Sequence, residues 1–90
     1  MGKAAVKIKI MPDSPDADLD AIESVVKKEI EAVEGRIAKI EREPIAFGLN
    51  AIFIIFAWDE DADRDALEEK IRALEHVNSA DIIDFRRAFG

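Results

Sequence analysis

The sequence predicts a single two-layer α+β domain, with two helices packed on one face of a four-stranded antiparallel sheet. Apolar residues alternate at a period of two over residues 4–11, recur every three or four residues in two later segments, and run unbroken over residues 51–58. These patterns are typical of strand, helix and buried strand, respectively. Ninety residues, of which 49% are hydrophobic, allow one domain over residues 1–90 with one core.

The first strand and the first helix have clear boundaries. Apolar and basic side chains alternate over residues 4–11, which predicts a half-buried strand with one basic face. Pro12 and Pro15 break the pattern among residues that cap helices, so a helix should begin near residues 16–18. Gly35 predicts its end. The apolar stripe of this helix consists of Leu19, Ile22, Val25, Val26, Ile30 and Val33.

Two strands of different character follow the first helix. Residues 36–42 predict a short, charged strand in which Ala38 and Ile40 share one face. Pro44 closes this strand, as suits the edge of a sheet. The apolar run 51–58 is rich in β-branched and aromatic side chains, which at this length is typical of a strand flanked by other strands. We therefore expect residues 51–58 at the centre of the sheet.

A strongly acidic segment leads into the second helix. Residues 59–69 hold seven acids and one base, but their spacing does not fit an EF-hand calcium loop. We interpret the acids as caps at the positive end of a helix, with an electrostatic surface for a partner as the alternative.

His76 is expected to be a plain surface residue in the turn that follows the second helix. A last strand is predicted over residues 80–87, with Ile83 and Phe85 on one face. The stripe of the second helix is Leu67, Ile71 and Leu74.

The order of elements is strand, helix, strand, strand, helix, strand, which is a split βαβ unit repeated once. Right-handed crossovers then give a ferredoxin-like α/β sandwich, βαββαβ, with the first and third strands central. Helices cover only one side of such a sheet, whereas the third strand is apolar on both sides. We therefore expect an apolar patch on the open face, either as a partner surface or beneath a terminal segment such as Phe89.

Composition argues against several classes of function. A formal charge of −7 repels a phosphate backbone, so we expect no direct nucleic-acid binding. The chain has no Cys and only one His, which excludes disulfides, thiolate metal sites and His-based catalytic clusters within one chain. The N-terminus resembles neither a signal peptide nor a membrane span, so a cytoplasmic protein is expected. We also expect no cofactor. The absence of Gln beside 37% charged residues points towards a thermophile.

The functional candidate is a turn rather than a catalytic cluster. No Thr or Tyr occurs, the three serines lack a plausible base, and no Gly-rich phosphate cradle is present, so no covalent chemistry is expected. Before the central strand, Pro44 restrains the backbone and Gly48 permits a positive φ. Phe47 lies between them at a solvent-facing turn. It either anchors in the pocket of a partner or folds onto its own core.

Three segments of the chain resemble one family. They are Met-Pro-Asp-Ser-Pro-Asp at residues 11–16, Glu-Pro-Ile-Ala-Phe-Gly-Leu at residues 43–49, and Ile-Ile-Asp-Phe-Arg-Arg at residues 82–87. Together they resemble the archaeal beta subunits of translation elongation factor one, which are guanine-nucleotide exchange factors. The likeness extends over essentially the whole chain and to the C-terminal exchange domain of the eukaryotic counterpart. The Pro-Ile-x-Phe-Gly turn is its most specific part.

The resemblance implies a partner and a set of contact residues. The partner is the translation elongation-factor GTPase that carries aminoacyl-tRNA, bound in its GDP-bound and nucleotide-free states by a factor that is monomeric alone. Phe47 occupies the position of the loop aromatic that wedges into the GTPase. Arg87 matches a Lys that in eukaryotic relatives reaches towards Mg²⁺ and phosphate, although Arg is bulkier than Lys. A plain solvated charge is the alternative for Arg87. The implied contact residues are Pro44, Ile45, Ala46, Phe47, Gly48, Asn50, Arg86 and Arg87.

Other functions of the same topology compete with this interpretation. A small-molecule-binding regulatory domain of the ACT type shares the fold and would dimerise through its sheet. A purely structural subunit would bind a GTPase without changing nucleotide release. An RNA-binding domain is the least favoured, because the expected stacking aromatics and basic sheet are not evident in the sequence.

Overall fold

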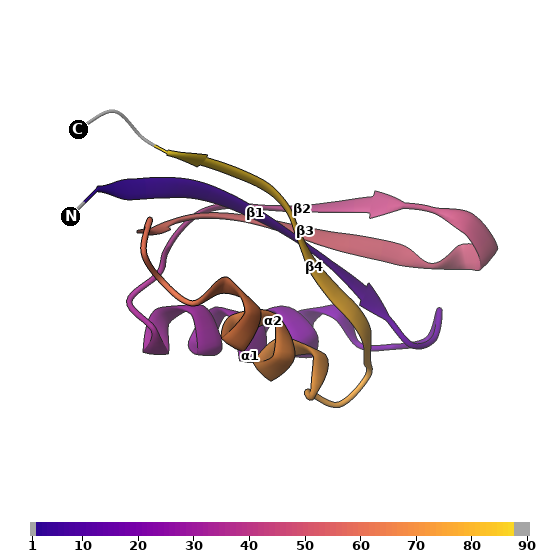
Figure 1. The fold of residues 1–90 in the computed structure, drawn as a ribbon. Helices are drawn as coiled ribbons and strands as arrows, with labels where there is room; N and C mark the ends of the chain where they lie inside the picture. Colours follow the sequence, from indigo (N-terminus) through magenta and orange to yellow (C-terminus); the bar gives the residue numbers. More distant parts are fainter. Residues whose placement is uncertain (1, 88–90) are drawn as a thin grey trace.

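The protein is a two-layer sandwich, seen here in a computed structural model that describes residues 2–87 (Figure 1). The strands are β1 (Lys3–Pro12), β2 (Arg36–Pro44), β3 (Asn50–Asp59) and β4 (Val77–Arg87). The helices are α1 (Leu19–Ala32) and α2 (Arg64–Arg72), with a 3₁₀ turn, η1, at Ala46–Gly48. The sheet has the order β2-β3-β1-β4, every neighbouring pair is antiparallel, and both helices lie on one side. The ferredoxin-like prediction, with the first and third strands central, is confirmed.

The core lies between the helices and one face of the sheet. The buried side chains come from alternating positions of β1 and β3 and from one stripe of each helix. Val25, which was expected in the stripe of α1, is instead 42% exposed. Consecutive helix residues point about 100° apart, so Val26 faces the sheet and its neighbour does not. The fully buried large side chains include Val6, Ile8, Ile10, Val26, Ile30, Ile52, Ile54, Phe56, Leu67 and Ile71.

Acidic side chains cap both helices, as the sequence predicted. The Asp18 carboxylate accepts a hydrogen bond from the Ala21 backbone N–H at 3.2 Å, and Asp63 accepts one from Ala66 at 3.0 Å. Each bond satisfies one of the backbone donors that a helix leaves free in its first turn. At least part of the acidic segment 59–69 therefore stabilises the start of α2.

The two edge strands depart from the predicted pattern. In β2, Ile37 and Ile40 pack on the core while Ala38 is exposed, because the register with β3 shifts between Ile37 and Lys39. In β4, which begins earlier than predicted at Val77, Phe85 packs on the core but Ile83 is 50% exposed. The register between β4 and β1 shifts between Lys7 and Ile8, which leaves Ile83 as an extra residue in β4. The side chains after it therefore move to the other face.

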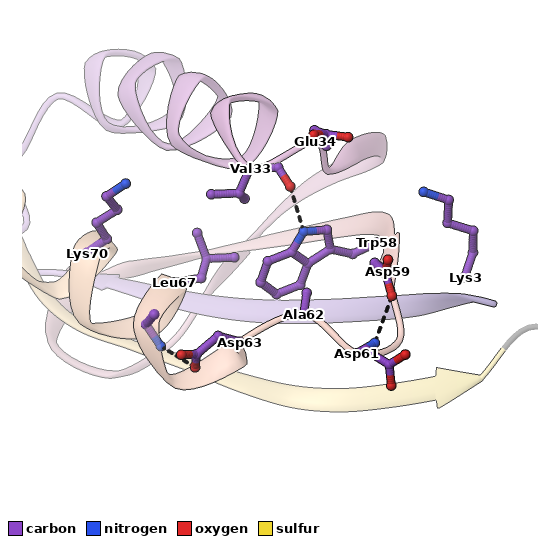
Figure 2. Close-up of a pocket in the computed structure, with 11 residues that line it drawn as sticks. Lys3, Val33, Glu34, Trp58, Asp59, Asp61, Ala62, Asp63, Leu67 and Lys70 are labelled. Carbon is purple, nitrogen blue, oxygen red and sulfur yellow. Dashed lines mark hydrogen bonds between the residues drawn. The ribbon is translucent and has the colours of Figure 1, made fainter. Parts of the chain in front are cut away.

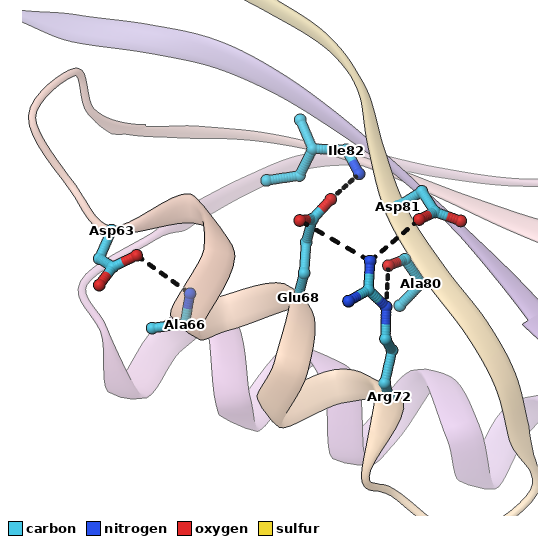
Figure 3. A network of polar contacts seen from close by, with 7 residues as sticks. All are labelled: Asp63, Ala66, Glu68, Arg72, Ala80, Asp81 and Ile82. Atoms are coloured by element: carbon cyan, nitrogen blue, oxygen red, sulfur yellow. Dashed lines mark hydrogen bonds and ion pairs between the residues drawn. The ribbon is translucent and has the colours of Figure 1, made fainter.

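Each edge strand is tied to a helix by an arginine. Arg72 of α2 donates from Nε to the Ala80 carbonyl at 3.1 Å and pairs with Asp81 at 3.0 Å, while Glu68 accepts from the Ile82 backbone N–H at 2.6 Å (Figure 3). Glu68 thus satisfies a donor that the edge of β4 would otherwise expose. These contacts hold the first half of β4 against α2.

The other edge is held in the same way. Arg42 of β2 forms ion pairs with Glu23 and Asp20 of α1. The hydrogen bonds that Arg42 donates to Glu23, first, and to Asp20 raise the pKa of Arg42 above its ordinary value, so the guanidinium stays charged.

Neither helix of residues 2–87 is long and apolar enough to cross a membrane.

We expect Gly35→Ala to destabilise the fold. A Cβ atom at Gly35 would lie 2.5 Å from Ile30 Cγ2 and 3.2 Å from Phe56 Cδ2, and both side chains are buried. Overpacking of this kind typically costs about 1–3 kcal/mol. Chemical denaturation measures the loss, with Gly2→Ala as the control. A Cβ at Gly2 would meet only the rotatable end of Glu60, so equal losses in the two variants would contradict the packing argument.

Candidate functional site

The tip of the β2–β3 hairpin, residues 44–50, displays an aromatic ring to solvent. Phe47 is 91% exposed and has a left-handed backbone conformation with φ 62° and ψ 28°. Gly48 follows with φ 74°. The turn is closed by backbone hydrogen bonds from Ile45 N–H to the Leu49 carbonyl at 2.8 Å and from Leu49 N–H to the Ala46 carbonyl at 3.2 Å. The hairpin tip is therefore an ordered turn that holds one ring outwards.

The conformation of Phe47 has a cost that packing of its own side chain does not offset. A left-handed conformation costs an ordinary L-residue roughly 1–2 kcal/mol, which Gly48 avoids because it has no Cβ. The Phe47 ring is not buried, so no packing within the domain compensates for this strain. The alternative that Phe47 folds onto its own core is wrong. Strained, exposed residues of this kind concentrate at binding sites.

The hairpin tip lies beside the loop that joins β1 to α1. A Cβ atom added to Gly48 would be 3.8 Å from the Cβ of Pro15, which places the two turns next to each other. Asp13 in the same loop donates its N–H to the His76 carbonyl at 2.9 Å, and His76 Nδ1 lies 3.9 Å from the Asp13 carboxylate. His76 is a surface residue, as predicted. The first two segments of the family resemblance thus meet at one end of the molecule.

The two candidate arginines lie at the opposite end. Arg86 and Arg87 pair with Ala5 and Ala4 near the start of β1, whereas the hairpin tip lies beyond the end of β1 (Figure 1). The ten-residue strand β3 separates the two ends, which at about 3.3 Å per residue corresponds to roughly 30 Å. The structure therefore groups six of the eight candidate residues and leaves the two arginines apart.

The arginine end, Arg86 and Arg87, carries exposed charges with weak partners. Arg87 is 74% exposed at its side chain, and its Nε lies 4.0 Å from the Glu60 carboxylate. Arg86 pairs with Asp84 at 3.1 Å. Because successive side chains of a β-strand alternate, Arg86 and Arg87 point to opposite faces of the sheet. Surface pairs of this kind contribute little to stability, so both guanidinium groups are available for contacts with a partner.

A pocket of about 460 Å³ lies near the arginine end, where β3 leads into α2 (Figure 2). Its apolar walls include Trp58 and Leu67, and its rim carries Lys3 and Lys70 among several carboxylates. The Trp58 indole N–H donates to the Val33 carbonyl at 2.8 Å, so this ring is already fixed by the fold. Within residues 2–87, no buried side-chain polar atom lacks a hydrogen-bond partner. The pocket walls therefore present no unsatisfied buried side-chain polar group that would orient a small ligand.

The face of the sheet opposite the helices is only partly covered, as the apolar pattern of β3 predicted. Phe53, Ile55 and Ala57 are half-buried on this open face, whereas Ile54 and Phe56 on the other face are fully buried. Phe89, which was offered as a possible cover, lies outside the described residues. The Lys7 ammonium group is 5.1 Å from the centre of the Phe53 ring, so part of the apolar surface lies beneath a lysine stem.

The described part of the chain shows no constellation for metal chemistry. Among residues 2–87, no three His, Cys, Asp or Glu side chains are placed so that they could hold one ion. None of the charged or polar residues in this range is buried. The features that remain for function are therefore surface features: the hairpin tip, the arginine end and the open face.

Sequence comparison decides the family. The chain matches the family described as EF-1 guanine nucleotide exchange domain over residues 5–88. It belongs to this family. Elongation factor 1-beta of Methanobrevibacter smithii is 41% identical over 97% of this chain and 98% of its own length. Elongation factor 1-beta of Methanothermobacter thermautotrophicus is 38% identical, over 97% of this chain and 98% of its own length.

Solved structures of other proteins share the fold of this exchange-domain chain. Ribosomal protein S6 of Thermotoga maritima aligns with a TM-score of 0.65 at 20% identity, covering 97% of this chain and 89% of its own. The ACT domain of GTP pyrophosphokinase from Chlorobium tepidum aligns with a TM-score of 0.63 at 14% identity, covering 88% and 96%. At these identities the likeness concerns the fold alone, because one fold hosts many functions.

Proposed function

We propose that this chain is a translation elongation factor that promotes GDP release from the GTPase delivering aminoacyl-tRNA. The family match supports this function, and one observation carries the assignment of the site. Phe47, in the family turn, is held in a strained conformation and points into solvent. An aromatic side chain that enters a partner pocket is a common source of binding energy.

The exchange factor would act by binding one state of the GTPase more tightly than another. GTPases of this class hold GDP through a phosphate loop, Mg²⁺ and ordered switch segments. Insertion of Phe47 into the nucleotide-free GTPase stabilises that state. By thermodynamic reciprocity, GDP affinity falls by the same factor by which GDP weakens binding of the exchange factor. No covalent step is involved, and the cellular ratio of GTP to GDP sets the direction of exchange.

Arg87 supplies a second, electrostatic contribution. A guanidinium group close to the Mg²⁺ and phosphate region of the GTPase would compete with the metal for negative charge. Because Arg87 and Phe47 lie at opposite ends of β3, one GTPase that meets both must lie along the length of the sheet. The longest dimension of the exchange domain, 41 Å, is compatible with such an arrangement.

Stopped-flow release of a fluorescent GDP analogue from the cognate GTPase tests the function. We expect the wild-type chain to accelerate release in a concentration-dependent, saturable manner. Binding to the GTPase without any change in release would instead indicate a purely structural subunit. The ACT-like alternative predicts thermal stabilisation by an amino acid and no interaction with the GTPase, and a titration with the twenty amino acids detects it.

We expect Arg87→Ala to reduce the acceleration only in part, by about three- to tenfold, because one charge-assisted contact is lost. Because the Arg87–Glu60 pair is weak, its loss should change the stability of the fold very little. Arg87→Lys retains the charge and should keep most of the activity. Lys28→Ala, an exposed cation on α1, is the control. Equal rates for Arg87→Ala and Lys28→Ala would show that Arg87 is a plain solvated charge.

A further inference from the structure

The centre of the open face combines apolar and cationic groups. Phe53, Ile55 and Ala57 of β3 form its apolar middle. Their partners across the sheet are Lys9, Lys7 and Ala5 on β1 and Glu41, Lys39 and Arg36 on β2. Four of these six neighbours are therefore cationic, in a chain that has 20 acidic residues and 13 basic ones. The basic face that the sequence predicted for the first strand is thus matched by cations of β2 on the other side of β3.

Most of these cations have no carboxylate partner of their own. Lys39 pairs with Glu41 at 3.4 Å. Within residues 2–87, Lys7, Lys9 and Arg36 form no ion pair, although Lys7 lies over the Phe53 ring. Asp84 and Asp81 of β4 stand opposite Lys7 and Lys9, but these carboxylates pair with Arg86 and Arg72 instead. The helix side is different, because Asp20 and Glu23 of α1 engage Arg42 there, and Arg72 lies 3.8 Å from Glu68 of α2. Unpaired cations around apolar side chains are complementary to a surface that is acidic and partly apolar.

The open face runs from the hairpin tip to the end of β4, where Arg86 shares this face and Arg87, opposite the buried Ala4, lies on the helix side of the sheet. A specific protein interface usually involves about 20–30 residues on each side, whereas the hairpin tip and the arginine end together provide nine. A GTPase that contacts both ends must therefore also cover part of the surface between them. The sheet face offers apolar area for this purpose, and it runs the length of β3 from the hairpin tip to the arginine end.

We propose that the open face is a docking surface for an acidic, partly apolar strip of the same GTPase, which rests on the exchange function proposed above. It supplies affinity and orientation, while Phe47 and Arg87 act on the nucleotide site. A second copy of this chain is a poorer occupant, because a face-to-face dimer would oppose the same cations. Single-stranded RNA is also a poorer fit, since such sheets stack two or three bases on aromatic side chains and, among the residues that the structure describes, Phe53 is the only aromatic at the centre of this face.

The test compares two double variants that remove the same charge from opposite faces. Lys7→Gln with Lys9→Gln alters the open face, and Lys27→Gln with Lys28→Gln alters the exposed surface of α1. GDP release is measured over a range of factor concentrations. For the open-face variant we expect the half-saturating concentration to rise about fivefold with the maximal rate unchanged. The difference should shrink at high salt, where charges are screened beyond about 3 Å. Lys7→Arg with Lys9→Arg should restore the wild-type value.

Each outcome either supports or overturns the proposal. Equal half-saturating concentrations for the two double variants would overturn the docking surface and leave the exchange function intact. If the wild-type chain fails to accelerate release, the exchange function fails. Calorimetric titration of nucleotide-free GTPase with both double variants then tests the docking surface separately. Fluorescence anisotropy that shows lysine-dependent binding of labelled single-stranded RNA would overturn it. Sedimentation that shows a lysine-dependent homodimer would overturn it as well.

Discussion

Replacing Phe47 with alanine is expected to abolish most of the acceleration of GDP release while leaving the fold intact. Phe47 is 91% exposed, so removal of its ring creates no cavity. Truncating an interface aromatic that is buried in a partner pocket costs about 2 kcal/mol or more, which is roughly a 30-fold loss of affinity or rate. Stopped-flow release of a fluorescent GDP analogue measures the loss, and thermal unfolding confirms that the variant is folded.

A matched control separates this contact from a general loss of exposed apolar surface. Val25→Ala shortens another exposed hydrophobic side chain, on α1 and away from the hairpin tip, and should exchange GDP like the wild type. Phe47→Gly should lose exchange as Phe47→Ala does. Unlike alanine, glycine accepts the positive φ at this position without backbone strain. If Phe47→Ala binds and exchanges as the wild type does, the assignment of the site is wrong.

The same substitution at Phe56 should have the opposite result. Phe56 lies on the helix side of β3, is fully buried, and has its ring centre 5.8 Å from that of Trp58. Phe→Ala substitutions in cores typically cost about 3–5 kcal/mol, because apolar contact is lost and a cavity remains. In a domain of this size, 1 kcal/mol corresponds to a shift of about 4–8 °C in Tm. A drop in Tm of more than about 12 °C is therefore expected for Phe56→Ala.

Urea denaturation of the Phe56→Ala and Phe47→Ala variants provides the comparison. Phe56→Ala should lower the midpoint strongly, whereas Phe47→Ala should leave it close to that of the wild type. At a temperature where Phe56→Ala is still folded, its folded fraction should exchange GDP normally, because the hairpin tip does not depend on that side chain. A loss of less than about 1 kcal/mol would contradict the core described here.

The fold was predictable because its central elements carry strong and simple patterns. The alternation in β1, the stripes of the helices and the apolar run of β3 led to the observed strand order. Apart from Val25 of α1, the errors in facing fall on the edge strands, at Ala38 and Ile83. A bulge adds one residue to one strand of a pair, and a period-two pattern contains no signal for the extra residue.

The site was predictable in its parts but not in its arrangement. Pro44 and Gly48 around Phe47 indicated an exposed turn, and the structure shows one, although its left-handed aromatic residue could not be foreseen from composition. The distance between the hairpin tip and the arginine end follows from strand direction, which becomes visible only once the register is known. The sequence predicted the basic face of β1 and the apolar open face, but not that cations of β1 and β2 flank the same apolar residues, because the two strands are far apart in the sequence.

The most direct test of the central claim is ¹⁹F NMR of the chain labelled with 4-fluorophenylalanine, with the Phe47 signal assigned by comparison with Phe47→Leu. In the free protein this signal should have the shift and solvent sensitivity of an exposed ring. Addition of the nucleotide-free GTPase should move or broaden it strongly, and addition of excess GDP should reverse the change. A Phe47 signal that keeps its free-state shift and linewidth at saturating GTPase would contradict the claim that this ring enters the partner.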